Sequence, residues 1–221
     1  MNRLVLIDGN AIVHRAYHAL PPLHKTEEGQ LTNAVYGFFS MTLKIVGDLA
    51  PDNLIVCFDR AAPTFRKQMY VGYQATRPKM EDDLAGQFEI IRDVLKRIKV
   101  CVFELDGYEA DDLIGTLSHQ AYKDNKENDV VILTGDRDLL QLVNHRVRIL
   151  APITGVTKMI LFDEDKMMNL FKQNRIRLQH EMMHDYVLIT AGTKDLQKFI
   201  QKYSSDNEVF QDPTTFLRVI R

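Results

Sequence analysis

The sequence has few cysteines, no long hydrophobic run and almost no net charge. Only Cys57 and Cys101 are present, both within apolar runs typical of strands, which predicts reduced core thiols in a cytoplasmic protein. No apolar run approaches the roughly 20 residues that a membrane span needs. The N-terminus reaches Asp8 after only a few apolar residues, so it reads as a first buried strand and not as a signal peptide.

The formal net charge is only −2, with 28 basic and 30 acidic residues. Proteins that bind nucleic acid usually need a basic surface to neutralise phosphates. A protein that gathers its acids at one cation-binding site can escape that rule, because bound cations invert the local field. Net charge alone therefore decides nothing about nucleic-acid binding.

Strand and helix patterns alternate along the chain. Short apolar runs rich in β-branched residues predict strands at Leu4–Asp8, Leu54–Phe58, Val100–Phe103, Val130–Thr134 and Val147–Leu150. Apolar residues at helical spacing predict helices at Thr32–Val46, Leu84–Ile98, Glu109–Tyr122 and Arg137–Val143. The alternation predicts an α/β fold with a mostly parallel central sheet flanked by helices.

Two segments depart from this alternation. Residues 60–83 are basic and aromatic, contain two prolines and show no clear apolar face. From about Asp163 onward the pattern becomes wholly helical. We expect a core at 1–165 and a C-terminal helical subregion at 166–221.

Acidic residues follow four of the predicted strands. The carboxyl ends of parallel strands meet at one edge of a sheet, where ligands collect in such folds. Like charges crowded there would repel one another unless cations lay among them, and oxygen-only ligands suit Mg²⁺ or Mn²⁺. The sequence therefore predicts a metal site made by Asp8, Asp59, Glu109, Asp111, Asp112, Asp136 and Asp138.

Other interpretations exist for these acids. Asp136 can cap the helix predicted at Arg137–Val143, and the acids at the start of Glu109–Tyr122 complement a helix dipole. Phosphatases of the haloacid dehalogenase type also place an Asp after the first strand, with a second Asp two residues on. Asn10 occupies that second position, which weighs against a phosphoaspartate enzyme.

Several longer motifs identify a family. The stretches are LIDGNAIVHRAYHALPPL, TNAVYGFFSM, FDRAAPTFRKQMYVGYQATRPKM, GYEADDLIGTL and TGDRDLLQLV, in that order over roughly residues 3–165. They resemble the 5′-nuclease domain of bacterial DNA polymerase I, a relative of the flap nucleases. The resemblance implies a PIN-like fold in which a metal-activated water attacks a DNA phosphodiester.

The resemblance also implies roles for other residues. Segment 60–83 would form a helical arch or clamp over a single-stranded 5′ end. Arg66, Arg77 and Lys79 would contact phosphates there, with Arg77 and Lys79 next to the reaction, and Tyr73 could stack on a base. Further positions on the substrate side are Asn10, Arg15 and Tyr36, although core packing is an equal alternative for Tyr36.

The chain departs from the family pattern at two places. Gln74 stands where the family usually has a lysine thought to assist at the scissile phosphate, so a positive charge is lost. The family's GDSSDN segment, which completes a second metal site, has no clear counterpart after DYVLIT. Asp195 is a possible stand-in for a second-metal ligand, and Asp206 and Asn207 resemble that segment only superficially.

The duplex-binding turn is also shortened. In a helix–hairpin–helix, glycines let backbone N–H groups approach a phosphate closely, and only Gly192 remains for this. A stripe of Lys194, Lys198 and Lys202 could hold DNA instead, although a solvated helix face is an equal alternative. We expect one well-formed metal site, an incomplete second site and a degenerate grip on duplex DNA.

The sequence favours a metal-dependent 5′→3′ exonuclease or flap endonuclease acting on DNA that is branched or has a free 5′ end. The alternative is a catalytically weak, structure-specific DNA-binding protein of the same fold, favoured by Gln74 and the missing segment. A PIN-type ribonuclease fits less well, because those domains rarely carry an insertion such as 60–83. We expect a monomer, and the composition of the last residues favours a stand-alone protein.

Overall fold

The computed structural model describes residues 2–22, 25–27, 29–69 and 80–173. Its strands are β1 (Arg3–Asp8), β2 (Asn53–Cys57), β3 (Cys101–Phe103), β4 (Asp129–Leu133), β5 (Val147–Thr154) and β6 (Lys158–Phe162). Its α-helices are α1 (Gly9–Ala19), α2 (Asn33–Leu49), α3 (Phe65–Met69), α4 (Asp82–Arg97), α5 (Ala110–Asp124) and α6 (Glu164–Gln173). A 3₁₀ helix, η1, covers Asp138–Leu142.

The strands form one sheet in the order β3-β2-β1-β4-β5-β6. The first five are parallel, and β6 joins β5 as an antiparallel edge strand. The predicted α/β fold with a mostly parallel sheet is therefore confirmed. Among the described residues, no helix is long and apolar enough to cross a membrane.

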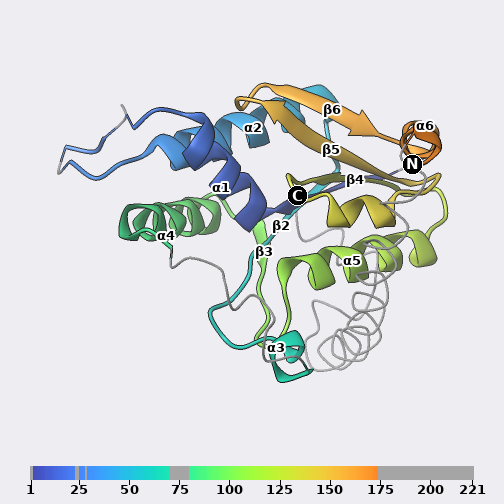
Figure 1. Cartoon of the computed structure of the whole chain (residues 1–221), viewed down its shortest axis with the longest axis horizontal. Helices are drawn as coiled ribbons and strands as arrows, with labels where there is room; N and C mark the ends of the chain where they lie inside the picture. Colours follow the sequence, from blue (N-terminus) through green and yellow to red (C-terminus); the bar gives the residue numbers. More distant parts are fainter. Residues whose placement is uncertain (1, 23–24, 28, 70–79, 174–221) are drawn as a thin grey trace.

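Helices cover both faces of the sheet, as Figure 1 shows. Along β1, Val5 and Ile7 belong to the core under α1, α2 and α4, whereas Leu4 and Leu6 belong to the core under α5. Alternating residues of one strand thus enter two different cores, which explains why the strand is apolar throughout. All of these β1 side chains are buried.

Three elements differ from the sequence prediction. Helix α1 was not predicted, because only a narrow stripe of Gly9, Ile12, Val13 and Ala16 is buried. The segment predicted as a helix at Arg137–Val143 is the tighter η1. Strand β6 was also missed; it follows a turn in which Gly155 has a φ of 60°, a value that favours glycine.

Part of the predicted organisation lies outside the described residues. In segment 60–83 the structure describes α3 and the residues on either side of 70–79. The C-terminal subregion is described only as far as α6. The expectations for the following residues therefore stay predictions: Tyr73, Gln74, Arg77, Lys79, Gly192, Lys194, Asp195 and Lys198.

Candidate active site

Asp8 lies at the carboxyl end of the central strand β1 and starts helix α1. Its Oδ1 accepts a hydrogen bond from the Ala11 N–H at 3.0 Å, and its Oδ2 accepts one from the Thr134 hydroxyl at 2.7 Å. The side chain is only 3 % exposed. Burial raises the pKa of Asp8 to about 6, with Asp59 and Asp136 adding repulsion and the two hydrogen bonds opposing the rise.

Asp59 follows β2, the neighbour of β1. Its Oδ1 accepts a hydrogen bond from the Ala110 N–H at the start of α5, at 2.7 Å. Its own backbone N–H donates to the Asn10 side chain at 3.0 Å. Asp59 therefore ties the ends of β1 and β2 to the N-terminus of α5, and Asn10 has a structural contact besides its predicted contact with substrate.

Asp111 shows how closely the acids are gathered. Burial raises its pKa well above the usual value, and the charges of four other carboxylates raise it further. These are Asp8, Asp136, Asp59 and Glu109, which come from four different strand ends. We call Asp8, Asp59, Glu109, Asp111 and Asp136 the carboxylate cluster.

The other two predicted ligands have different surroundings. Both oxygens of Asp112 are bonded to the Arg66 guanidinium, each at 2.6 Å. Asp138 is exposed, and its backbone N–H donates to Asp136 Oδ1 at 2.9 Å. The N-cap of η1 is Arg137, which makes no side-chain capping bond, so the helix-cap interpretation of Asp136 is wrong. The charge of Asp136 acts on Asp8 and Asp111.

The carboxylate cluster has the right chemistry for a hard divalent cation. Its donors are all oxygens, and the repulsion that raises the Asp111 pKa would be relieved by positive charge. Within the part of the chain that the structure describes, however, no three His, Cys, Asp or Glu side chains are close enough to form a metal-binding group. The carboxylates of the cluster lie in one region of the protein. A complete first metal site, as expected from the sequence, remains a prediction.

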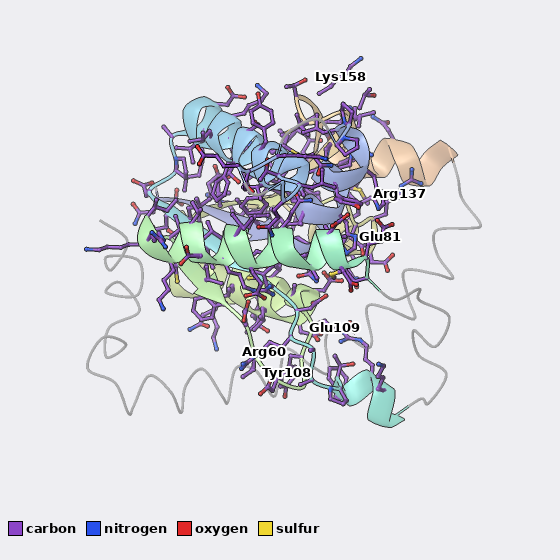
Figure 2. All side chains as sticks on the ribbon, turned by 90° about the vertical axis from the view of Figure 1, so that its left-hand side faces the viewer. Arg60, Glu81, Tyr108, Glu109, Arg137 and Lys158 are labelled. Carbon is purple, nitrogen blue, oxygen red and sulfur yellow. The ribbon has the colours of Figure 1, made fainter. Side chains whose placement is uncertain are left out.

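An open groove of about 510 Å³ borders Asp136. It runs between α1 and the loop from β4 to η1, and it is lined by Ala11, His14, Arg15, His18, Gly135, Asp136 and Arg137. Figure 2 shows Arg137 above Glu81, the residue before α4, with Glu109 below it. His14, His18 and Arg137 were not predicted from the sequence; for the two histidines, the helical spacing of residues 11, 14, 15 and 18 was the available signal.

The structure also places the predicted DNA contacts that lie within the described residues. Arg15 lines the groove, and its Nη2 donates to the Ile153 carbonyl at 2.5 Å. Tyr36 is 56 % exposed, so the core-packing alternative is wrong for this side chain. Arg66, at 5 % exposed, is buried against Asp112 and Glu109, which does not fit the predicted phosphate contact.

Comparisons with known proteins agree on one family. The profile of the 5′-3′ exonuclease, N-terminal resolvase-like domain, matches residues 3–172. DNA polymerase I of Mycobacterium tuberculosis is 44 % identical over 160 residues, which are 72 % of this chain and 18 % of the polymerase. DNA polymerase I of Caldicellulosiruptor bescii is 35 % identical over 227 residues, covering 95 % of this chain and 25 % of the polymerase.

A solved structure supports the same fold. The bacteriophage T5 D15 flap endonuclease, in a complex with DNA and metal ions, superposes with a TM-score of 0.55 at 18 % identity. The match covers 77 % of this chain and 61 % of that one. At this identity it shows the fold alone. This chain spans a quarter or less of the length of these two polymerases.

Proposed function

Since this chain belongs to the 5′-3′ exonuclease N-terminal family, we propose that it is a metal-dependent nuclease that hydrolyses DNA from a 5′ end or at a 5′ flap. One observation carries the proposal. Five carboxylates from four strand ends act on one another at the carboxyl edge of a parallel sheet. Repulsion between these like charges destabilises the fold. Such an arrangement is typical of a functional site, and a cation-dependent reaction would use it.

The proposed cofactor is Mg²⁺ or Mn²⁺, held by the carboxylate cluster. When bound, such ions supply charge stabilisation and Lewis acidity for attack on a phosphodiester. The chain's own contribution begins with Asp8, which the Ala11 N–H and the Thr134 hydroxyl hold in place. Asp59 is held in the same way by the Ala110 N–H. These hydrogen bonds fix the carboxylates before any ligand arrives, which favours preorganisation.

The proposed substrate is DNA that is branched or has a free 5′ end. The groove beside Asp136 offers two cationic side chains, Arg15 and Arg137, for phosphate oxygens. Arg15 is suited to this because, within the described part of the chain, its buried Nε has no hydrogen-bond acceptor. We also propose that Tyr36, which is 56 % exposed, stacks on a base of the substrate. We further propose a monomer that acts in the cytoplasm.

A second candidate is a DNA-binding protein of the same fold that cuts poorly. Gln74 favours it, because the lost lysine charge would weaken stabilisation of a phosphate. The crowded carboxylates favour the nuclease, since binding alone would gain little from buried negative charge beside a phosphate.

A cleavage assay separates the two candidates. A 5′-flap duplex, single-stranded DNA and single-stranded RNA would each be incubated with Mg²⁺ or Mn²⁺ and the protein. The Asp136→Ala variant removes one carboxylate of the cluster, and Asp93→Ala is a matched control on the exposed face of α4. We expect DNA products with the wild type and Asp93→Ala only. Flap binding without cleavage above the Asp136→Ala background would favour the binding protein.

A further inference from the structure

Arg66 and Asp112 form a buried ion pair beside the carboxylate cluster. Arg66 Nη1 donates to Asp112 Oδ2 and Nη2 donates to Asp112 Oδ1, both at 2.6 Å. The exposed fractions of the two side chains are 5 % and 0 %. A bidentate arginine–carboxylate pair that is shielded from water holds both partners in one geometry.

The pair reaches Glu109 by two contacts. Asp112 Oδ2 accepts a hydrogen bond from the Glu109 backbone N–H at 3.1 Å, which caps the start of α5. The Arg66 guanidinium also lies 3.2 Å from Glu109 Oε2. Both the backbone and the carboxylate of Glu109 are therefore fixed by this pair.

Helix α3 is docked at the same place. The Phe65 N–H donates to the Gly107 carbonyl at 2.9 Å, and the Phe65 ring packs on Tyr108 with 5.7 Å between centroids. The Arg66 guanidinium lies 4.7 Å from the Phe65 ring centroid. Phe65 and Arg66 of α3 thus hold the loop that leads into α5. Figure 2 shows Tyr108 of this loop beside α3.

This arrangement leaves little coordinating capacity on Asp112. Its two oxygens already accept three hydrogen bonds, and the side chain is fully buried. The Asp112 carboxylate is therefore committed to the contacts that hold Arg66 and the Glu109 backbone.

We propose that Arg66 and Asp112 are positioning residues: they hold Glu109 at the carboxylate cluster and dock α3, and Asp112 is not a metal ligand. The part that concerns metal rests on the proposed function. The assignment replaces two expectations from the sequence, a metal ligand at Asp112 and a phosphate contact at Arg66. Both corrections rest on the bidentate contact between Arg66 and Asp112, which are 46 positions apart in the sequence.

If Arg66 and Asp112 act as a pair, removing both charges should do less damage than removing either one. Arg66→Gln leaves the buried Asp112 carboxylate uncompensated, and Asp112→Asn leaves a buried guanidinium that can pull Glu109 away from the cluster. Breaking a buried pair on one side is strongly destabilising. The double variant removes both charges and keeps amide groups that can hydrogen-bond, so it should resemble the wild type more than either single variant does.

A double-mutant cycle tests this with two measurements made without DNA. The melting temperature of the metal-free protein is measured by circular dichroism, and Mn²⁺ affinity by calorimetry. We expect each single variant to weaken Mn²⁺ binding by about 10-fold or more, the range for residues that orient ligands. The double variant should recover most of that loss and most of the loss in melting temperature.

Matched controls identify what each change does. The exposed pair Asp93 and Arg97 on α4 has a similar 2.7 Å contact, so Arg97→Gln should leave both measurements close to wild type. Asp111→Asn should abolish Mn²⁺ binding, with no recovery when Arg66→Gln is added. If the double variant binds Mn²⁺ no better than Asp112→Asn alone, Asp112 is a ligand and the proposal is overturned.

The outcomes also separate this proposal from the proposed function. A wild-type protein that binds Mn²⁺ but cuts no DNA would overturn the nuclease while leaving the cycle interpretable. A wild-type protein without Mn²⁺ binding would overturn the metal site, and the melting temperatures would still decide the pair. If the losses in melting temperature of the two single variants then add up in the double variant, the positioning role of the Arg66–Asp112 pair is overturned. Recovery in the double variant would support that role.

Discussion

Thr134 donates its hydroxyl hydrogen to Asp8 Oδ2 at 2.7 Å and so joins the carboxyl ends of β4 and β1. The Thr134 hydroxyl oxygen also accepts a hydrogen bond from the Asp136 N–H at 2.9 Å. Thr134 is fully buried, and Asp8 nearly so. One hydroxyl therefore positions two members of the carboxylate cluster, each of which follows a different strand.

Replacing Thr134 by Val keeps the shape of the side chain and removes both hydrogen bonds. We expect a loss of about 1.5–3 kcal/mol in the free energy of unfolding, the usual range for a hydrogen bond to a charged group. Cleavage should fall as well, because Asp8 and the Asp136 loop lose a common anchor. Urea denaturation and flap cleavage would measure the two effects. Thr134→Ser keeps the hydroxyl and should retain most of both; equal losses in Ser and Val variants would contradict the role of the hydroxyl.

The position of the cluster could be predicted from sequence because it follows from chain order alone. Asp8 ends β1 and Asp59 lies just beyond β2, and parallel strands bring their carboxyl ends to one edge. The role of Asp112 could not be predicted in this way. Its partner Arg66 is 46 residues distant, and the spacing of GYEADD does not say which acid faces an arginine. The role of Thr134 could not be predicted either, because the sequence shows this residue only as the end of an apolar run. Its hydroxyl reaches Asp8 because β4 lies beside β1 in the sheet.

Asp111→Asn should stabilise the metal-free protein and abolish the effect of metal. In the wild type the buried carboxylate faces four like charges, so a neutral amide relieves repulsion. Mn²⁺ should raise the melting temperature of the wild type, by the equivalent of about 2.7 kcal/mol at 100 times the dissociation constant. The variant should melt higher in chelator and show no shift with Mn²⁺. A metal-induced shift that survives in Asp111→Asn would place the ion elsewhere.

Gln74→Lys restores the charge that the family pattern has at this position. If the family lysine assists by charge stabilisation, the cleavage rate should rise by about 10-fold or more, the scale of one lost or gained transition-state contact. Single-turnover cleavage of a 5′ flap would measure it. Gln74→Met, with a similar length and no charge, is the control. An unchanged rate would mean that another basic residue already fills the role.

Asp129, which lies outside the carboxylate cluster, should make the stability of the protein depend on pH. Burial alone would raise its pKa, but hydrogen bonds from Arg3 and Arg148 hold the pKa below the usual 3.8. The folded state therefore binds this proton less readily than the unfolded state. The stabilisation is fully present above about pH 4 and is lost as the pH falls through the lower folded pKa. We expect Asp129→Asn to be less stable than the wild type at pH 7, by a margin that shrinks below pH 4. Denaturation series at both pH values would measure it, and a constant margin would contradict the ion pairs.

Gly9 is where the backbone after Asp8 passes under an aromatic ring. A Cβ added to Gly9 would lie 2.3 Å from Phe58 Cε1, far closer than atoms can approach. The Phe58 ring cannot move away cheaply, because it is fully buried between Phe38 and Phe88, with the Arg92 guanidinium 4.7 Å from its centroid.

We therefore expect Gly9→Ala to cost about 1–3 kcal/mol in the free energy of unfolding, the range for overpacked cores. Because Asp8 precedes Gly9 and Asp59 follows Phe58, the shift should also lower cleavage. Gly47→Ala is the matched control: it lies in α2 with nothing within 4 Å of the added carbon, and it should stabilise by about 0.4–1 kcal/mol. Urea denaturation of both variants gives the comparison. A Gly9→Ala protein as stable as Gly47→Ala would mean that the chain leaves β1 by a different path, and the position of Asp8 would have to be revised with it.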